Sequence, residues 1–267
     1  MNADLNPVEV VEADGPVILG LPHTGTWLPD DIRARLNERG QGLTDTDWHI
    51  HRLYDGLLPG ATTVRATFHR YVIDANRGPD NESLYPGQNT TGLVPLTDFD
   101  GQPIWTQEPT AQDVADRTAL FHAPYHAALS AEIARVRARH GVAILYDCHS
   151  IRSRIPFLFD GVLPDFNIGT ADGASCAPAI EAAAQEVAAA TGRPFVVNGR
   201  FRGGWTTRHY GRPLDGVHAI QMELAQSTHL AAEAPPFALD DAKAAALRSV
   251  LSNILRTLAD LAPDLKG

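Results

Sequence analysis

Residues 142–150 read Val-Ala-Ile-Leu-Tyr-Asp-Cys-His-Ser, an aliphatic run that ends in polar side chains. A short apolar run bounded by polar sequence is typical of a buried β-strand, which we place at Val142–Tyr146. Four other runs, rich in β-branched or aliphatic residues, have the same character: Val17–Leu21, Thr62–Phe68, Phe195–Val197 and Ala219–Leu224. These five runs are the strands that we expect.

Longer segments with helical patterning separate the expected strands, at Asp30–Glu38, Trp48–Leu58, Ala111–Arg139, Ala177–Ala190 and Asp240–Leu261. Pro124 interrupts the third of these, so we expect that helix to break or kink near Ala123. Alternation of strands and helices predicts an α/β fold, with a mixed, mostly parallel sheet flanked by helices. The length suits a single domain over residues 1–267.

The composition excludes several classes of function. Among the 267 residues, 44% are hydrophobic and 20% charged, and the net charge of −10 disfavours nucleic acid as a partner. The two cysteines are too few for a thiolate zinc finger or a disulfide scaffold. We find neither a secretory signal at the amino terminus nor an apolar run of roughly 20 residues that would cross a membrane. We therefore expect a cytoplasmic protein without membrane partners, and nothing in the sequence specifies an oligomeric state.

Polar side chains follow the expected strands, where reactive groups of α/β folds collect. His23 comes after Val17–Leu21, and His149 comes after Val142–Tyr146. Asp147, two residues before His149, points to the same face of a strand and could either orient that histidine or share its site. Glu223 lies inside an apolar strand, where a carboxylate is costly to bury unless it is paired, near a metal or catalytic. Two histidines and a nearby carboxylate predict a catalytic zinc site, although the same ligands accept other divalent ions.

A catalytic zinc takes three protein ligands as a rule, and the segment 45–51, Asp-Thr-Asp-Trp-His-Ile-His, is the richest source of the third. We select Asp47. Asp45 is an alternative, although one of the two aspartates is expected to cap the helix that starts near Trp48. His49 and His51 also remain candidates.

Arginines near glycines indicate an anionic substrate. Arg77 offers a planar fork that binds a carboxylate through two hydrogen bonds, and Asn76 adds an amide donor. Arg77 precedes a long segment, residues 78–109, that has many Pro, Gly, Asn and Thr residues. A loop of that length in a compact domain is often functional. Further arginines lie in the glycine-containing sequence 198–211, at positions 200, 202 and 208.

Several motifs resemble, in order and spacing, the N-formylglutamate amidohydrolase family over roughly residues 16–230: PHTGTWLP, DTDWHIHRLYD, RYVIDANR, SLYPGQNTTGL, PYHAAL, DCHSIRS, NGRFRGGWTTRHYG and GVHAIQMELAQ. The family is related to zinc carboxypeptidases and aspartoacylase. The resemblance therefore implies a phosphorylase/hydrolase-like α/β fold. It also implies zinc-dependent hydrolysis of N-formyl-L-glutamate to formate and L-glutamate, the last step of a histidine-degradation route.

The resemblance also assigns roles to individual residues. His23 and His149 match zinc histidines, and Asp47 takes the place of the carboxylate ligand. Glu223 looks like the general base that takes a proton from the attacking water. Asn76 and Arg77 resemble the pair that grips the substrate α-carboxylate; for the second carboxylate or the oxyanion the candidates are Arg152, Arg202 and Arg208.

Other activities are compatible with parts of this pattern. The nearest is a deacylase of another N-acyl acidic amino acid, or a metallocarboxypeptidase. A non-catalytic protein that binds acidic metabolites would have no need for the buried base Glu223. A serine hydrolase is disfavoured, because Ser150 and its neighbour His149 point to opposite faces of a strand and no G-x-S-x-G elbow is present.

Overall fold

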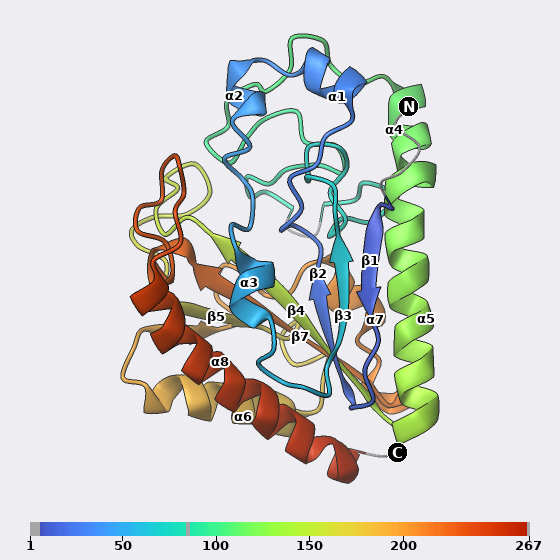
Figure 1. Ribbon diagram of the computed structural model, residues 1–267, viewed down its shortest axis with the longest axis vertical. Helices are drawn as coiled ribbons and strands as arrows, with labels where there is room; N and C mark the ends of the chain where they lie inside the picture. Colours follow the sequence, from blue (N-terminus) through green and yellow to red (C-terminus); the bar gives the residue numbers. More distant parts are fainter. Residues whose placement is uncertain (1–5, 84–85, 266–267) are drawn as a thin grey trace.

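The computed structural model describes residues 6–83 and 86–265. Residues 1–5, at the amino terminus, and Leu84 and Tyr85 of the SLYPGQNTTGL motif lie outside the described residues, as do residues 266–267. The core is one seven-stranded mixed sheet in the order β1-β3-β2-β4-β7-β5-β6 (Figure 1). The strands are β1 (Val8–Val11), β2 (Val17–Leu21), β3 (Thr62–Ala66), β4 (Ala143–Ile151), β5 (Phe166–Gly169), β6 (Phe195–Val197) and β7 (Val217–Ala225).

All five expected strands are present, and the α/β fold with a mixed sheet is confirmed. β2, β3, β4 and β7 run parallel to their neighbours in the centre, whereas β1 and β5 join antiparallel to β3 and β7. The two strands that the sequence did not indicate are short. β1 lies at the sheet edge and buries only Val8, so it has no apolar alternation to read. β5 is four residues long, within the length at which strand and loop patterns look alike.

The helices are α1 (Asp30–Arg35), α2 (Glu38–Gln41), α3 (Ile50–Tyr54), α4 (Ala111–Arg117), α5 (Ala123–His140), α6 (Pro178–Ala190), α7 (Trp205–Tyr210) and α8 (Asp241–Leu261). Those at 30–38 and 48–58 are shorter than expected, and α2 and α7 are additional. Within the described residues, no helix is both long and apolar enough to cross a membrane.

The long helical segment around Pro124 departs from the prediction of a break near Ala123. A π-helical turn, Thr118–His122, joins α4 directly to α5, and Figure 1 shows one continuous rod. Ala123 N–H donates to Thr118 O, five residues back, and Pro124 occupies the first turn of α5. Proline lacks an N–H, and widening the helix by one residue accommodates it without ending the helix.

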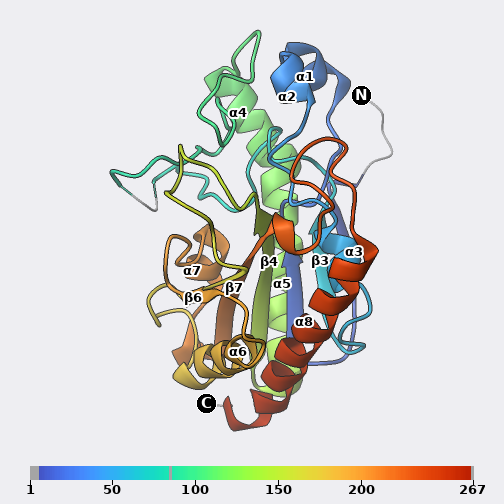
Figure 2. The same ribbon diagram turned by 90° about the vertical axis from the view of Figure 1, so that its left-hand side faces the viewer.

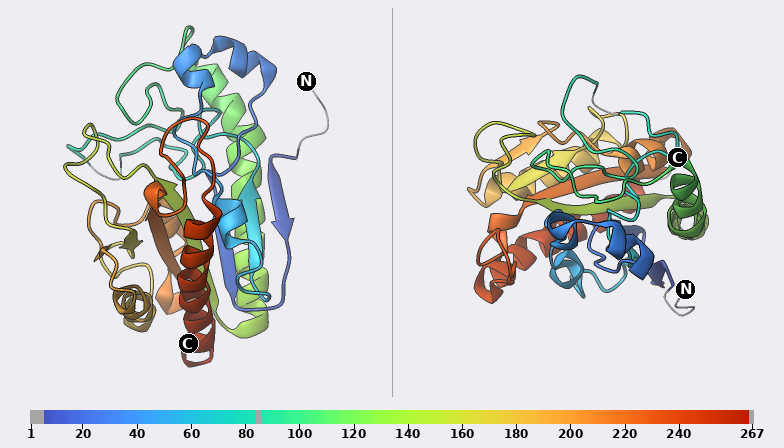
Figure 3. Two further views of the ribbon diagram at one scale, coloured as in Figure 1. Left: turned by 60° about the vertical axis from the view of Figure 1, so that its left-hand side comes forward. Right: turned by 90° about the horizontal axis from the view of Figure 1, so that it is seen from above.

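Both faces of the sheet are covered. On one face the side chains of β2, β4, β5 and β7 pack against α3, α6 and α8. On the other, β3 and the alternate residues of β2 and β4 pack against α1 and α5. Figure 3 shows chain on both sides of the sheet when it is seen from above.

The alternation along β4 and β7 decides where the polar residues point. Ala143 and Leu145 of β4 face the layer of α5, so Asp147 and His149 share that face. In β7, Glu223 pairs with His149 in the parallel register and points the same way. Described parts of the segment that follows Arg77 extend away from the sheet in Figure 2. The carboxyl ends of the central strands therefore hold the polar cluster.

Candidate active site

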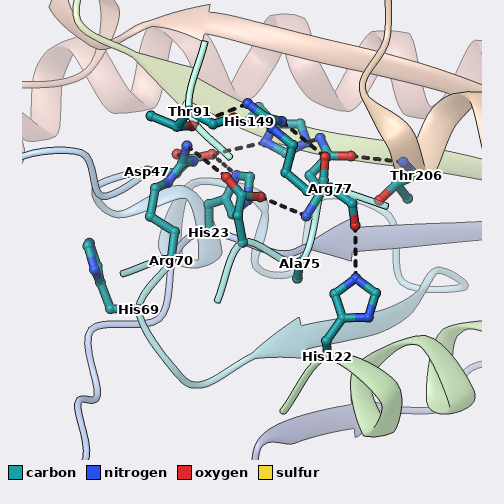
Figure 4. A network of polar contacts seen from close by, with 12 residues as sticks. His23, Asp47, His69, Arg70, Ala75, Arg77, Thr91, His122, His149 and Thr206 are labelled. Atoms are coloured by element: carbon teal, nitrogen blue, oxygen red, sulfur yellow. Dashed lines mark hydrogen bonds and ion pairs between the residues drawn. The ribbon is translucent and has the colours of Figure 1, made fainter. Parts of the chain in front are cut away.

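Three segments bring His23, Asp47 and His149 together at the carboxyl ends of β2 and β4 (Figure 4). One ligand atom from each lies within 4.8 Å of the other two, and all three side chains are buried. Asp47 Oδ2 is 3.2 Å from His149 Nδ1 and 3.9 Å from His23 Nδ1. The Asp47 N–H donates to His23 O at 3.0 Å, which ties the loop before α3 to the end of β2.

The two imidazoles are oriented in the same way. His23 Nε2 lies 2.7 Å from Asp74 Oδ1, and His149 Nε2 lies 3.0 Å from Asp147 Oδ2. Asp147 thus contacts His149, as their shared strand face predicts. Each ring therefore directs Nδ1 toward Asp47, and His23 Nδ1 is buried with no hydrogen-bond partner among the described residues. A carboxylate behind each imidazole is the arrangement found around metal-ligating histidines.

The charges of the cluster favour a cation. The carboxylates of Asp47, Asp74 and Asp147 are all buried there, and the fully buried guanidinium beside them is Arg70. Arg70 Nη2 contacts Asp47 Oδ1 at 2.9 Å, and its Nη1 is 3.7 Å from Asp74 Oδ2. The three carboxylates outnumber that one buried guanidinium. Burial lowers the pKa of His149, but the charge of Asp147 outweighs it and raises that pKa well above its usual value, so a proton sits where a divalent ion would balance the same charge.

The pKa values of Asp74 and His23 depend on burial and on these neighbouring charges. Burial alone would raise the pKa of Asp74, but His23, Arg77 and Arg70 outweigh it and hold that pKa well below its usual range. Burial lowers the pKa of the imidazole of His23, and Arg70 adds to the effect. A neutral ring with a free Nδ1 is the form of histidine that binds a metal ion.

The alternatives to Asp47 as the third ligand have other partners. Asp45 Oδ2 accepts hydrogen bonds from Tyr71 Oη at 2.8 Å and Phe99 N at 2.9 Å, so Asp45 does not cap α3. His49 Nε2 is 2.8 Å from the carbonyl of Phe237, and His51 Nδ1 is 2.6 Å from Thr24 Oγ1. The cluster geometry thus favours Asp47 over its neighbours.

Glu223 stands next to the cluster on β7. Its carboxylate receives a hydrogen bond from Gln221 Nε2 at 3.2 Å, and Gln221 Oε1 accepts one from Gly204 N at 2.6 Å. Burial raises the pKa of Glu223 to about 8, although His149 opposes the shift. A carboxylate with its pKa raised toward neutrality is suited to take and return a proton.

A cavity opens over this cluster and has both polar and apolar walls. It is lined by His23, Arg70, Asn76, Arg77, Asn89, Thr90, Thr91, Phe99, His149, Ser150, Ile151, Leu158, Arg200, Phe201, Gly204, Gln221 and Glu223. Three arginines in one cavity make it suitable for an anionic ligand with more than one acidic group.

Arg77 and Asn76 lie in the cavity wall, side by side in a buried segment. Four hydrogen bonds hold the guanidinium: from Nε to Thr91 O at 3.0 Å, from Nη1 to Asn76 O at 3.0 Å, and from Nη2 to Thr90 Oγ1 at 3.2 Å and to Thr91 Oγ1 at 3.4 Å. The Asn76 amide accepts a hydrogen bond from Thr206 N at 2.8 Å, and its nitrogen lies 3.1 Å from His149 Nε2. Both side chains are thus fixed before any ligand arrives.

The structure places the other predicted arginines differently. Arg152 Nη2 contacts Asp100 Oδ1 at 3.1 Å, and Arg208 Nε donates to Gly203 O at 2.9 Å. Arg202 is 49% exposed and its Nη1 lies 3.4 Å from Asp172 Oδ2. Among the described residues that line the cavity, these three do not occur, whereas Arg200 does.

The sequence of the whole chain can now be set beside known proteins. A model of the N-formylglutamate amidohydrolase family matches residues 15–230. The chain belongs to the N-formylglutamate amidohydrolase family. It is 48% identical to a protein of Pseudomonas aeruginosa named N-formylglutamate deformylase, over 91% of this chain and 92% of that protein. A protein of the same name from Pseudomonas putida is 46% identical over the same shares.

A solved structure agrees with this membership. The crystal structure of an N-formylglutamate amidohydrolase from Ralstonia eutropha JMP134 superimposes with a TM-score of 0.80 at 25% identity, and covers 98% of each chain. The fold of this family member is therefore that of a solved relative, and the resemblance noted from the motifs is confirmed.

Sequence reasoning did not single out Arg70, Asp74 or Gln221 in this amidohydrolase-family chain. Arg70 and Asp74 belong to the quoted RYVIDANR motif, and Asp74 precedes the Asn-Arg pair by two residues. A buried charge in an apolar motif was the available signal, the same one that pointed to Glu223. Gln221 shares the strand face of Glu223, two residues away.

Proposed function

We propose that this chain is a metal-dependent amidohydrolase that hydrolyses N-formyl-L-glutamate to formate and L-glutamate. Residues 1–267 form one catalytic domain in this proposal, which acts in the cytoplasm at the last step of histidine degradation. The observation that carries it is the convergence, in one cavity, of the His23–Asp47–His149 cluster, the buried Glu223 and three arginines. The names of the similar Pseudomonas proteins support the choice of substrate.

The residues present fit a divalent cation, and we propose zinc. His23 and His149 would supply Nδ1 and Asp47 a carboxylate oxygen, a set of three that suits a catalytic zinc. The orphaned His23 Nδ1 and the surplus of buried carboxylate charge support this assignment. A cation bound there lowers the pKa of a water molecule and polarises the formyl carbonyl.

Glu223 is the proposed proton carrier. It takes a proton from the water molecule as the water oxygen bonds to the formyl carbon. It then gives that proton to the amide nitrogen as the carbon–nitrogen bond breaks, which yields formic acid and the amine of L-glutamate. The acid passes its proton to the amine, and formate and L-glutamate leave. Gln221 holds the carboxylate of Glu223 in place during both transfers.

The arginines of the cavity would bind the two carboxylates of the substrate. Arg77, with its guanidinium fixed by Thr90 and Thr91, would receive the α-carboxylate together with Asn76. We propose Arg200 for the side-chain carboxylate, since it lines the cavity beside Phe201 and is held by Leu158 O at 3.0 Å and Asn89 O at 2.9 Å. A guanidinium offers a carboxylate a planar set of N–H donors, which the ammonium group of lysine does not reproduce.

Formate release from N-formyl-L-glutamate tests the proposal. The wild-type protein should lose turnover on complete removal of metal and regain it with zinc. Glu223→Gln keeps the shape of the side chain and removes the proton acceptor, so kcat should fall by about 10²–10⁴-fold with the metal retained. Undiminished turnover after complete metal removal would refute metal dependence, and full activity of E223Q would refute the role of Glu223.

The same assay separates the alternative substrates. N-acetyl-L-glutamate differs from the proposed substrate by one methyl group beyond the scissile carbon, and a peptide with carboxyl-terminal glutamate differs by much more. A deformylase should prefer the formyl compound in kcat/KM over both. Equal or better turnover of the acetyl compound or the peptide would favour a broader deacylase or a carboxypeptidase.

A further inference from the structure

The segment that carries Asn76 and Arg77 is buried although it has no regular secondary structure. Residues 71–76 are all shielded from solvent, and no helix or strand covers this stretch. Buried backbone carbonyls without a partner are costly, so this segment depends on neighbouring side chains for its hydrogen bonds. Which groups supply them decides where Asn76 and Arg77 stand.

The continuous helix formed by α4, the π-helical turn and α5 supplies three of these partners. His122 Nε2 lies 2.9 Å from Arg77 O, and His126 Nε2 lies 2.8 Å from Ala75 O. One turn earlier, Arg117 Nη1 donates to Val72 O at 3.2 Å. Figure 4 shows His122 reaching from the helix to the carbonyl of Arg77. The two histidines thus bracket Asn76 on either side.

The π-helical turn explains why these side chains share one face. Arg117 and His122 are five residues apart, which in an α-helix of 3.6 residues per turn would separate them by about 140° around the axis. The turn at Thr118–His122 closes with an i→i+5 bond, so a spacing of five brings side chains to the same side. His126 follows His122 at the ordinary spacing of four.

The two imidazoles are enclosed by aromatic side chains from α7. Tyr210 Oη lies 3.1 Å from His126 Nδ1, and the Trp205 ring centroid is 4.8 Å from that of His126 and 5.9 Å from that of His122. Burial lowers the pKa of His126 to about 3, and it lowers that of His122 as well. Neutral rings bonded at Nε2 to carbonyl oxygens must carry their proton on Nε2, so both donate.

The other side of the segment is held by the start of α7. Thr206 N donates to the Asn76 side-chain oxygen, and a side chain on Gly78 would meet Trp205 Nε1 at 2.8 Å. The stretch between Ala75 and Gly78 therefore lies between α5 and α7, and neither helix contributes a residue to the His23–Asp47–His149 cluster.

We infer that His122 and His126 are positioning residues that fix the Asn76–Arg77 pair for the carboxylate of the substrate. The inference rests on the proposed function. Without the two donors the carbonyls of Ala75 and Arg77 lose their partners, and the segment relaxes away from its place in the cavity wall. A displacement on the order of 1 Å is enough to weaken a two-pronged contact severely.

The test compares His122→Leu and His126→Leu with His122→Gln and His126→Gln. Glutamine places an amide N–H near the position of Nε2, whereas leucine has no donor. In the leucine variants, KM for N-formyl-L-glutamate and the inhibition constant of L-glutamate should each rise on the order of tenfold, with a much smaller change in kcat. The glutamine variants should restore values near those of the wild type.

His140→Leu is the matched control. His140 also lies on α5 and its Nε2 contacts a backbone carbonyl, Asp14 O at 2.7 Å, far along the helix from the cavity. This variant should leave KM and the L-glutamate inhibition constant unchanged, so that a general loss of helix stability is separated from positioning.

Unchanged KM and L-glutamate inhibition in folded H122L and H126L, with an active wild type, would overturn the positioning role alone. Equal changes in H140L would do the same. Absence of wild-type turnover on N-formyl-L-glutamate would overturn the proposed function and this inference with it. If the leucine variants do not fold, the glutamine variants are compared with asparagine variants at the same two positions. The asparagine amide is one carbon too short to reach the backbone carbonyl, so KM should be higher for asparagine than for glutamine. Equal KM values for the two would also overturn the positioning role.

Discussion

Two pairs of buried histidines lie around the Asn76–Arg77 segment, and they differ in the partner of Nε2. His23 and His149 contact carboxylates, whereas His122 and His126 contact backbone carbonyls. In the first pair Nδ1 points into a cluster of negative charge. In the second, the rings lie against aromatic side chains and, at His126, a tyrosine hydroxyl.

The difference shows that the partner, more than the burial, decides what a histidine can do. A carboxylate behind the ring raises its basicity and leaves a lone pair directed at a cation. A carbonyl partner carries no net charge, so the ring remains a neutral hydrogen-bond donor that holds the backbone in place. The first pair is therefore suited to chemistry and the second to positioning. Three predictions test this contrast.

The largest effect is expected from removing a ring of the first pair. His149→Ala deletes one of the three proposed ligand groups, so the purified protein should contain little metal, and kcat/KM should fall by at least about a thousandfold, or about 4 kcal/mol. Elemental analysis and formate release measure both quantities. His126→Gln, from the second pair, should keep its metal. A His149→Ala protein with a full complement of metal would break the contrast.

A smaller effect is expected from neutralising a carboxylate partner. Asp74→Asn keeps an oxygen that can accept from His23 Nε2 but removes the charge, so metal affinity should weaken by about 10–100-fold. Competition with a chromogenic chelator measures this change. Asp113→Asn, at a surface ion pair with Arg35, is the control and should leave metal affinity unchanged. Equal affinities for both variants would mean that the charge of Asp74 does not tune the ring.

Sequence pattern predicted the central strands because they are buried on both faces. The runs at Val17–Leu21 and Val142–Tyr146 have no polar residue until the strand is near its end, and this marks both the strand and the place of its reactive side chain. His23, His149 and Glu223 were therefore visible as a group. Their convergence follows from parallel strands whose carboxyl ends meet at one sheet edge.

Features that depend on tertiary contacts were harder to predict. Arg200, Arg202 and Arg208 share a glycine-rich stretch, and only the path of the chain between β6 and α7 directs Arg200 into the cavity. The π-helical turn at Thr118–His122 inserts one residue, which apolar periodicity does not register. Pro124 revealed an irregularity there, but a proline does not distinguish a widened turn from a break.

The smallest effect concerns the protonation of the second pair. The pKa of His126 is about 3 in the folded chain because of burial, against an ordinary value of 6.5 when unfolded. The unfolded chain therefore binds more protons below pH 6.5, so the stability that depends on neutral His126 is present above that pH and is lost as pH falls toward 3.

Between pH 7 and pH 5.5 this histidine should cost the folded state about 1 kcal/mol. Urea unfolding at the two pH values measures the loss for the wild type and for His126→Gln, which has no proton to gain. Both proteins share every other titrating group, so the difference between their losses isolates His126. The wild type should lose about 1 kcal/mol more than the variant. Equal losses would mean that His126 takes up its proton over the same pH range in the folded and the unfolded chain, and a ring that gains charge so readily would remove the distinction between positioning histidines and those suited to a metal.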